Sequence, residues 1–480
     1  MSLNQRFSQY LQPFLVLVWV VAYFLYLGWK PAFAYNAQRY FEILLLGCLL
    51  CAGATLPIRF HWGRLWAGLC LMLLLVMLLV VWRADNHWLA VREVMQYLAL
   101  FAAILVVAKA RHHAGAASFD RAAYMGLVIF CFGCSLIVLE GLLLSLSIGG
   151  LDHRLIFGAF VNVRIFSEIQ FLTLLILPAA WLHMSTAGWR CFIGLTAMLW
   201  WGLLLLTGTR SALLALPFAL LLLGLVGGRG TLGWFKVLVA QFLGGALVYL
   251  LLQGGVARYL DIPSLSGGSM NFARATSSGR LEIWGEAWQH FLQHPWLGNG
   301  PGAFACFTSE LVASPHNLLF LLLSEWGVFV TLLCFALALL MFAALVRHLR
   351  IGQCKKPLEL SLFAILVVTV VASMMQGMIL SPLSQMLIVL VFGWSLSVFS
   401  KQRFVPLTGK AWSRYQGLGV VVLAGFLAIT LWGVKSDLAL QDELLISPDG
   451  TINLSYGPRF WADGHDHCTD WHERYQNRSR

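Results

Sequence analysis

Charge is scarce in this chain. Only 11% of its 480 residues are Asp, Glu, Lys or Arg, whereas ordinary soluble domains carry about 25%. Sixty per cent of the residues are hydrophobic, and the mean hydropathy is +0.79. So few charges cannot cover the surface of a water-soluble enzyme, and so many apolar residues exclude a disordered or fibrous protein. The composition therefore indicates a protein that lies in a membrane.

The sequence also lacks a basic segment interleaved with aromatic residues, and it has no internal repeat of fixed period. The formal net charge is +11, but the Lys and Arg residues stand between apolar segments rather than in polar runs. We therefore expect no nucleic acid among the partners, and we expect contact with membrane lipids.

Long apolar segments make up most of the chain. A helix of roughly 20 apolar residues spans a bilayer, so these segments predict an all-α polytopic membrane protein with about 12–13 transmembrane helices. The expected spans lie near residues 11–29, 40–57, 64–82, 88–108, 122–147, 167–184, 191–207, 209–227, 232–253, 317–346, 358–380, 384–399 and 415–433.

The basic residues predict the orientation, because cytoplasmic loops carry an excess of Lys and Arg. With a cytoplasmic N-terminus, the short outer loops hold only Lys30, Arg39, Arg83, Arg154, Arg164 and Arg210. The cytoplasmic loops then hold Arg59, Arg64, Lys109, Arg111, Arg121, Arg190, Arg229, Lys236, Arg347, Arg350, Lys355, Lys356, Lys401, Arg403, Lys410 and Arg414. The opposite orientation inverts this bias and is rejected.

This orientation divides the chain into three parts. Residues 1–433 form the transmembrane helical domain, residues 254–316 form a long outer loop inserted within it, and residues 434–480 form an outer tail. The first apolar segment, with Arg6 before it and Ala32-Phe33-Ala34 after it, resembles a signal peptide. Its apolar run is longer than usual for one, so we expect an uncleaved helix.

Two of the ten cysteines, Cys306 and Cys468, fall on the outer side. A disulfide between them is compatible with an oxidising compartment, but spacing alone does not bring two sulfur atoms together. The sequence leaves their pairing open.

Arginine and histidine recur where the outer parts of the chain meet helices. Arg164 precedes the span at 167–184, Arg210 begins the span at 209–227, Arg280 begins a segment of the outer loop, and His316 precedes the span at 317–346. The planar guanidinium group matches phosphate oxygens. A cluster of these residues predicts a site for a pyrophosphate.

The outer loop contains an amphipathic helix pattern after Arg280. Leu281, Trp284, Trp288 and Phe291 recur on one helical stripe. Such a helix is expected to lie along the membrane surface with its tryptophans toward the lipid. We expect Trp284 and Trp288, together with Asn317 beside His316, to contribute to substrate binding.

No Asp-x-Asp pair occurs in an outer segment. A metal-diphosphate site is therefore not expected, nor is any other cofactor, and arginine would neutralise the pyrophosphate instead. The histidine-rich stretch around Cys468 is a weak metal candidate, because no second ligand cluster accompanies it.

Single arginines also have a simpler interpretation. An arginine at a helix end is usually an interfacial anchor, and we assign that role to Arg39, Arg83, Arg92 and Arg258. Glu325 lies nine residues after His316, on the opposite helical face, and is expected to be an interior polar contact of the bundle.

Three motifs occur in order along the chain: TGTRSALLAL, then SGRxxxWxxAWxxFxxHPWLGNGPGxF in the outer loop, then PHNLLFxLLSEWG. Together they resemble the superfamily of O-antigen ligases, O-antigen polymerases and bacterial protein O-oligosaccharyltransferases. The stretch GAFVNVRIFSEIQ is similar to another segment of that family. The resemblance covers roughly residues 155–400.

The resemblance implies a metal-independent glycosyltransferase in the bacterial inner membrane with its active site facing the periplasm. The donor would be a glycan on undecaprenyl pyrophosphate, and the acceptor would be lipid A–core, a glycan or a protein. By motif, Arg280 and Arg210 would hold the pyrophosphate, Arg164 would hold the second phosphate or the glycan, and His316 would be the general base. An inverting single displacement is implied.

Several functions stay open from the residues alone. O-antigen ligation to lipid A–core is favoured over an O-antigen or exopolysaccharide polymerase, because one basic set serves one pyrophosphate. A protein (pilin) O-oligosaccharyltransferase is a further alternative. A transporter would show broken helices with polar groups at mid-membrane, whereas here the polar residues gather at one face. A sugar-binding scaffold would not need several arginines at helix ends.

Overall fold

The computed structural model describes residues 34–54, 56, 58–61, 63–147, 153–256, 279–309, 312–351, 356–400, 404–406, 425, 459 and 468. The spans expected at 11–29 and 415–433 lie outside the described residues, Gly425 excepted. Of the expected tail, Arg459 and Cys468 are described.

Each expected span from 40–57 to 384–399 has a helical counterpart. The helices before the outer loop are α2 (Ala34–Ala54), α3 (Arg64–Arg83), α4 (His87–Ala114), α5 (Ala116–Ser147), α6 (His153–Phe157), α7 (Val163–Thr173), α8 (Leu177–His183), α9 (Ala187–Thr207), α10 (Arg210–Gly227) and α11 (Leu232–Leu250). Short 3-10 turns η1 (Gly158–Phe160), η2 (Leu174–Ile176) and η3 (Gly228–Thr231) and a π turn η4 (Leu251–Val256) join or extend them.

The outer loop and the second half of the bundle follow. They comprise α13 (Arg280–Gln293), α14 (Phe304–Phe307), α15 (Leu318–Ile351), α16 (Pro357–Ser373) and α17 (Pro382–Phe399). A two-stranded antiparallel sheet, which the hydropathy pattern did not indicate, pairs β1 (Ile58–Phe60) with β2 (Phe404–Pro406).

The helices are long and apolar enough to cross a membrane. Among the described residues, eight helical stretches meet that requirement by length and composition, one of them running from α10 to η4. Gly228 (φ +58°) turns the chain between α10 and α11, so that stretch contains two of the expected spans. The all-α polytopic fold is confirmed.

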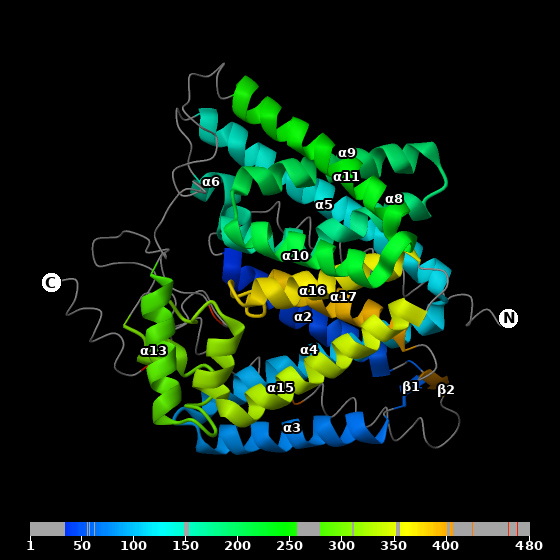
Figure 1. Cartoon of the computed structure of the whole chain (residues 1–480). Coiled ribbons are helices and arrows are strands. Elements are labelled where there is room, and N and C mark those ends of the chain that lie inside the picture. The colour runs from blue at the N-terminus through cyan, green and yellow to red at the C-terminus, as the bar shows by residue number, and fades with distance from the viewer. Residues whose placement is uncertain are drawn as a thin grey trace.

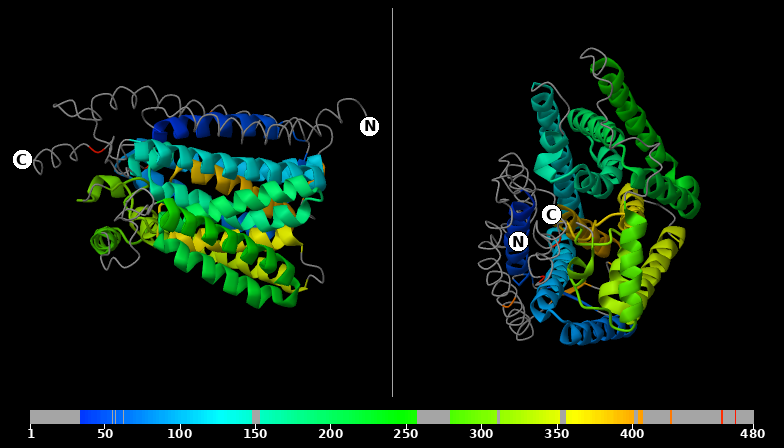
Figure 2. Two further views of the ribbon diagram at one scale, coloured as in Figure 1. Left: turned by 90° about the horizontal axis from the view of Figure 1, so that it is seen from above. Right: turned by 90° about the vertical axis from the view of Figure 1, so that its left-hand side faces the viewer.

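The bundle has two distinct ends. The long helices lie side by side in Figure 2, and in Figure 1 α13 runs across one end of the bundle while β1 and β2 lie at the other. α16 and α17 lie in the middle, and Trp200, Trp394 and Phe166 are among the largest fully buried side chains. The α13 end is called the outer end below.

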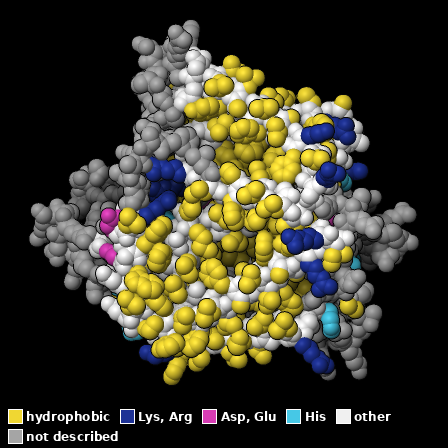
Figure 3. All heavy atoms as spheres, in the orientation of Figure 1, with side chains coloured by type: hydrophobic (Ala, Val, Ile, Leu, Met, Phe, Trp, Pro, Cys, Tyr) yellow, Lys and Arg dark blue, Asp and Glu magenta, His cyan; other side chains and the backbone are white. Residues whose placement is uncertain are grey.

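The outward faces of several helices are apolar. Large exposed side chains include Leu71 on α3, Leu221 on α10, Leu243 on α11 and Leu339 on α15. Figure 3 shows hydrophobic side chains over most of the visible face, with Lys and Arg gathered toward its edges. Such a surface is stable in lipid and not in water.

One span ends earlier than its hydropathy predicts. The run at 358–380 continues to be apolar, but α16 ends at Ser373 and residues 374–381 form an irregular connection to α17. Side chains from other helices hydrogen-bond the freed carbonyl groups: Asn317 Nδ2 reaches Met374 O at 2.8 Å, and Gln385 Nε2 reaches Ile379 O at 2.7 Å. This connection lies next to the predicted site residues.

Candidate active site at the outer end

Arg164 lies in the first turn of α7. Asn162 caps this helix, because its Oδ1 accepts hydrogen bonds from the backbone N–H groups of Arg164 (2.9 Å) and Ile165 (3.0 Å). The preceding Val161 has φ +70°, which is a strained conformation for a β-branched residue. The Arg164 side chain is exposed.

Arg210 is the first residue of α10. The turn before it is very short because Gly208 takes a left-handed conformation (φ +58°) after α9. The neighbouring Ser211 is buried, and its Oγ accepts a 2.6 Å hydrogen bond from Gln376 Nε2 in the α16–α17 connection. The predicted pair of helices around Thr207–Arg210 is therefore confirmed.

Arg280 is the first residue of α13 and is half-buried. Partial burial lowers its pKa from the ordinary value, and the positive charges of Arg164 and Arg210 lower it further. Arginines that repel one another in this way share one region of the protein. The three predicted arginines, from α7, α10 and α13, therefore converge.

His316 precedes α15 and is close to two of these arginines, Arg164 and Arg280. Burial, followed by the charges of Arg164 and Arg280, lowers its pKa from 6.5 to about 4. Its backbone is left-handed, with φ +49°, and its Nδ1 lies 3.4 Å from the position that a Cβ on Gly377 would take. The imidazole is thus held neutral next to a cationic cluster.

Asn317 and Trp284 fix the surroundings of His316. Asn317 Oδ1 accepts from the N–H groups of Leu319 (2.9 Å) and Phe320 (3.2 Å), and Trp284 Nε1 donates to Pro315 O at 3.0 Å. The Trp284 ring stacks on Phe320. These contacts are structural, and substrate binding by Asn317, Trp284 and Trp288 stays a prediction.

The helix expected after Arg280 is present, but its apolar residues divide between two faces. Ile283 and Ala287 are buried against the protein, whereas Leu281 (65% exposed), Trp288 (44%) and Leu292 (59%) stay exposed. A helix that lies across the end of the bundle with such a second face is suited to the lipid interface.

The Gly-rich turn after α13 docks onto a break in α15. Gly327 (φ +71°) interrupts this helix. The freed carbonyl groups of Ser324 and Glu325 accept hydrogen bonds from Asn299 N (3.0 Å) and Gly300 N (2.9 Å). The backbones approach so closely that a Cβ on Gly298 would lie 2.3 Å from the Glu325 carbonyl carbon, so glycine is required there.

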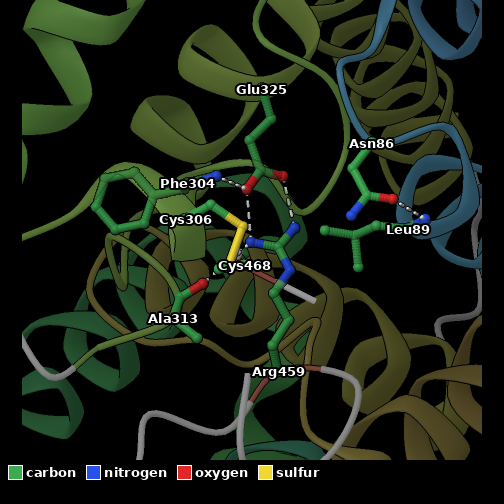
Figure 4. The surroundings of a disulfide bond; sticks show 8 residues. All are labelled: Asn86, Leu89, Phe304, Cys306, Ala313, Glu325, Arg459 and Cys468. Carbon is green, nitrogen blue, oxygen red and sulfur yellow. Dashed lines mark hydrogen bonds and ion pairs between the residues drawn. A yellow bond between two sulfur atoms is a disulfide. The ribbon is translucent and has the colours of Figure 1, made fainter. Parts of the chain in front are cut away.

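Figure 4 shows a buried ion cluster that the sequence did not predict. The figure draws the hydrogen bonds that Arg459, from the expected tail, donates to Glu325 Oε1 (2.6 Å) and Oε2 (2.5 Å). Arg459 also donates to Glu93 Oε1 (3.2 Å), which the figure does not draw. Glu325 is an interior polar group, as expected, but its partner lies 134 residues away in sequence. No local signal distinguishes Arg459 from the other basic residues of the tail.

The anchor interpretation is wrong for two arginines. Arg39 is 1% exposed and is paired with Glu42 (2.5 Å) inside the bundle, where Gln385 and Leu380 O also accept its hydrogen bonds. Arg92 is 6% exposed. Arg83 is exposed at the end of α3, in line with an anchor, and Arg258 lies outside the described residues. Arg39 is buried with one partner on its own helix, Glu42, and with others that are distant in sequence and that hydropathy cannot reveal.

Cys306 and Cys468 form a disulfide with a Cα–Cα distance of 5.1 Å. The bond joins α14 of the outer loop to the tail, so the two parts lie on the same side of the bundle, as the charge bias predicts. The described residues contain no group of three or more His, Cys, Asp or Glu side chains arranged to hold a metal ion. The tail histidines His465, His467 and His472 lie outside that part of the chain.

Comparison with known proteins matches the segment that carries most of this site. Residues 195–335 match the family model described as O-antigen ligase. An O-antigen ligase of Pseudomonas aeruginosa is 33% identical over 144 residues, which are 29% of this chain and 31% of that protein. The chain thus spans about a third of the length of this curated relative. The matches confirm the resemblance to the O-antigen ligase superfamily.

Proposed function

We propose that this chain, whose residues 195–335 match the O-antigen ligase family, transfers a glycan from undecaprenyl pyrophosphate to a hydroxyl group of lipid A–core. The observation that carries the proposal is the convergence of Arg164, Arg210 and Arg280 beside a neutral His316. The charges of Arg164 and Arg210 both act unfavourably on Arg280, and a polyanion that binds beside them relieves that repulsion. A neutral imidazole next to that anion can accept a proton.

The pyrophosphate of the donor occupies the arginine cluster. Arg210 and Arg280 bind the phosphate oxygens through their planar N–H groups, and Arg164 binds the second phosphate or orients the glycan. Their fixed charges stabilise the negative charge that develops on the leaving pyrophosphate. This arrangement does without a metal ion, and we propose that the reaction is metal-independent.

The polyprenyl chain of the donor runs along α10. Exposed Leu214 (56%), Phe218 (48%), Leu221 (62%) and Leu225 (69%) follow Arg210 on one face of that helix. A lipid whose head group binds at the start of α10 can lay its tail on this stripe. The charged head then stays at the outer end while the apolar tail stays in the membrane.

The transfer is a single displacement. His316 accepts the proton of the acceptor hydroxyl as its oxygen forms a bond to the anomeric carbon of the donor sugar. The bond between that carbon and the pyrophosphate oxygen breaks, and the electron pair leaves with the pyrophosphate. The configuration at the anomeric carbon inverts. Binding of the pyrophosphate offsets the arginine charges and raises the pKa of His316 toward the range that suits a general base.

We place the site at the periplasmic face of the bacterial inner membrane. The support is the predicted excess of basic residues on the other side and the disulfide between the outer loop and the tail, since disulfides persist in oxidising compartments. A multi-pass membrane protein with its site at this face meets both amphiphilic substrates where their head groups lie.

A deletion strain tests the proposal. A strain without a ligase makes lipid A–core without polymer and accumulates long glycans on undecaprenyl pyrophosphate. Core capped with a single repeat, or loss of an exopolysaccharide, would identify a polymerase instead. Normal lipopolysaccharide with an unglycosylated pilin or other protein would identify an oligosaccharyltransferase. Complementation by the wild-type chain but not by the His316→Ala variant links the phenotype to the candidate site.

A further inference from the structure

Arg459 is buried between three parts of the protein. Its side chain is 2% exposed, and its guanidinium group contacts Glu325 on α15, Glu93 on α4 (3.2 Å) and the carbonyl oxygen of Ala313 (3.1 Å). Burial alone would lower the pKa of Arg459, but the two carboxylates raise it above the ordinary value. The guanidinium is therefore a fixed charge on which two buried carboxylates depend.

These contacts lead to segments on both sides of the candidate site. Glu325 accepts hydrogen bonds from the backbone N–H groups of Gly302 (3.1 Å) and Phe304 (3.2 Å), at the end of the outer Gly-rich turn. Ala313 lies three residues before His316 in the chain. Arg459 thus holds the outer loop where it returns from α13 and where it reaches His316.

The main-chain carbonyl group of Arg459 links it, through Arg39 and Tyr35, to the α16–α17 connection. Its carbonyl oxygen accepts hydrogen bonds from Arg39 Nη2 (3.0 Å) and from the Tyr35 hydroxyl. Arg39 Nη2 also donates to Leu380 O at 2.7 Å, and the Tyr35 hydroxyl oxygen lies 3.1 Å from the same carbonyl oxygen. Leu380 belongs to the α16–α17 connection, whose Gly377 lies against His316.

A covalent bond secures this part of the tail. Cys468 is bonded to Cys306, which follows two residues after the Phe304 whose N–H group binds Glu325. The disulfide and the ion cluster therefore connect the tail independently to the same turn of the outer loop, as Figure 4 shows.

We propose that Arg459 is a positioning residue of the candidate site, and that the Cys306–Cys468 disulfide keeps it in place. Arg459 then completes the site: His316 and Arg280 reach their working geometry only when Arg459 is held in the ion cluster. This inference rests on the proposed function for its kinetic consequence, but the docking itself is measurable without any transfer assay.

The kinetic test compares two buried arginines. Arg111 forms a bidentate pair with Asp120 (2.6 and 2.8 Å) and sits in the last turn of α4. That end of α4 packs through Ala108 against Ile58 of β1 and Phe404 of β2, at the end of the bundle opposite α13. We expect Arg459→Gln to lower kcat by about 100-fold, because small misplacements of reacting groups cost that much. Arg111→Gln should lower thermal stability but leave kcat of the folded protein unchanged. Equal kcat in both variants would overturn the proposal.

Two further variants distinguish a positioning role of Arg459 from a general loss of folding. Arg459→Lys keeps the charge but cannot bind Glu325 through two N–H groups, so its kcat should lie between wild type and Arg459→Gln. The double variant Arg459→Gln/Glu325→Gln should be no worse than Arg459→Gln alone, because the two residues act as one unit. Additive losses would contradict the assignment.

The disulfide is tested by replacing each of its cysteines. Cys306→Ser, Cys468→Ser and the double variant should show the same partial loss of kcat, because all three remove one bond. Dithiothreitol, which reduces the disulfide to two thiols and is itself oxidised, should bring wild type to that level. Cys334→Ser, which affects a free thiol, is the control. Unchanged kcat after reduction, verified by mass spectrometry, would show that the bond does not hold the site.

The docking itself is measured with a reporter thiol. Ser314 is 2% exposed, so Ser314→Cys should resist a maleimide in a chain whose free thiols have been replaced and whose Cys306–Cys468 disulfide is kept. It should become reactive when combined with Arg459→Gln or with Cys306→Ser/Cys468→Ser, but not with Arg111→Gln. Equal labelling in all four proteins would refute the docking. Labelling as expected in a protein that transfers no glycan would leave the docking in place and refute the proposed function instead.

Discussion

His316 shows how a side chain acquires its chemistry from neighbours that are distant in sequence. Its free imidazole would titrate near 6.5, whereas burial and then Arg164 and Arg280 lower its pKa to about 4. In the free protein the imidazole is therefore half protonated near pH 4 and neutral at pH 7. The bound pyrophosphate compensates the arginines, so the pKa of His316 rises in the complex.

For this reason, kcat/KM and kcat should begin to fall at different pH values as the solution is made more acidic. The limb of kcat/KM, which reports the free protein, should fall only as the pH drops toward 4. The limb of kcat, which reports the complex, should lie at higher pH. Recovery of activity on return to pH 7 excludes unfolding. Two limbs that coincide near 6.5 would contradict the electrostatic account of His316.

The arginines should differ sharply in their tolerance of substitution. Arg280→Ala and Arg210→Ala should each lower kcat by about 100-fold or more, as loss of a charge that stabilises the transition state does. Arg280→Lys should also fail, because an ammonium group cannot make a bidentate contact with phosphate. Arg83→Ala, which removes an exposed arginine at the end of α3, should keep wild-type kcat in the same assay.

At the scale of single residues, the motifs singled out side chains that composition alone could not have identified. Arg164, Arg210, Arg280 and His316 all stand at the beginning of helices, and the structure brings them together at one end. The sequence did not predict that Arg39 and Arg459 are buried. Arg39 has a local partner in Glu42, but Gln385 and the Glu325 that pairs with Arg459 are distant in sequence, and only the packing of the helices turns these two ordinary cations into buried ones.

Among the elements, the two breaks next to the site are the least visible in the sequence. The apolar run of α15 passes through Gly327 without a change in hydropathy, yet the helix is interrupted there. Likewise, α16 ends at Ser373 within an apolar stretch. Both breaks persist because other segments hydrogen-bond the freed carbonyl groups: Asn299 and Gly300 at the first, Asn317 and Gln385 at the second. A single helix pattern does not contain that information.

The close contact between the Gly-rich turn after α13 and α15 predicts that Gly298 does not tolerate a side chain. Gly298→Ala places a methyl group 2.3 Å from the Glu325 carbonyl carbon and forces a left-handed residue to carry a Cβ. Backbone strain of this kind costs about 1–3 kcal/mol before the clash is added. We expect a lower thermal midpoint and a lower kcat. Gly285→Ala on α13, where a Cβ meets nothing within 4 Å, should be neutral or stabilising; equal effects at both positions would refute the docking.

For the whole molecule, hydropathy predicted most of the helices that the structure describes. Every described span has its expected counterpart, because burial in lipid imposes a length and a composition that a sequence displays directly. The sheet between β1 and β2 and the disulfide between Cys306 and Cys468 depend on which segments meet in space. Neither can be derived from spacing along the chain.

The sidedness of the bundle can be measured with two single cysteines in a chain whose free thiols have been replaced. Gln289 on α13 and Arg350 near the end of α15 are both exposed. Gln289→Cys should react with a membrane-impermeant maleimide in cells permeabilised only at the outer membrane. Arg350→Cys should react only after the inner membrane is broken. The reverse pattern would invert the topology and place the arginine cluster in the cytoplasm.

The most direct test of the central claim is glycan transfer by the purified protein. Undecaprenyl pyrophosphate carrying a polymerised glycan is the donor, lipid A–core is the acceptor, and the reaction is run in excess EDTA. We predict high-molecular-weight lipopolysaccharide that forms with wild type and Arg83→Ala but not with Arg280→Ala or His316→Ala. Activity that requires added Mg²⁺ or Mn²⁺, or full transfer by the His316→Ala variant, would contradict the arginine-and-histidine mechanism. Transfer only to a second donor molecule, and never to lipid A–core, would contradict the ligase assignment.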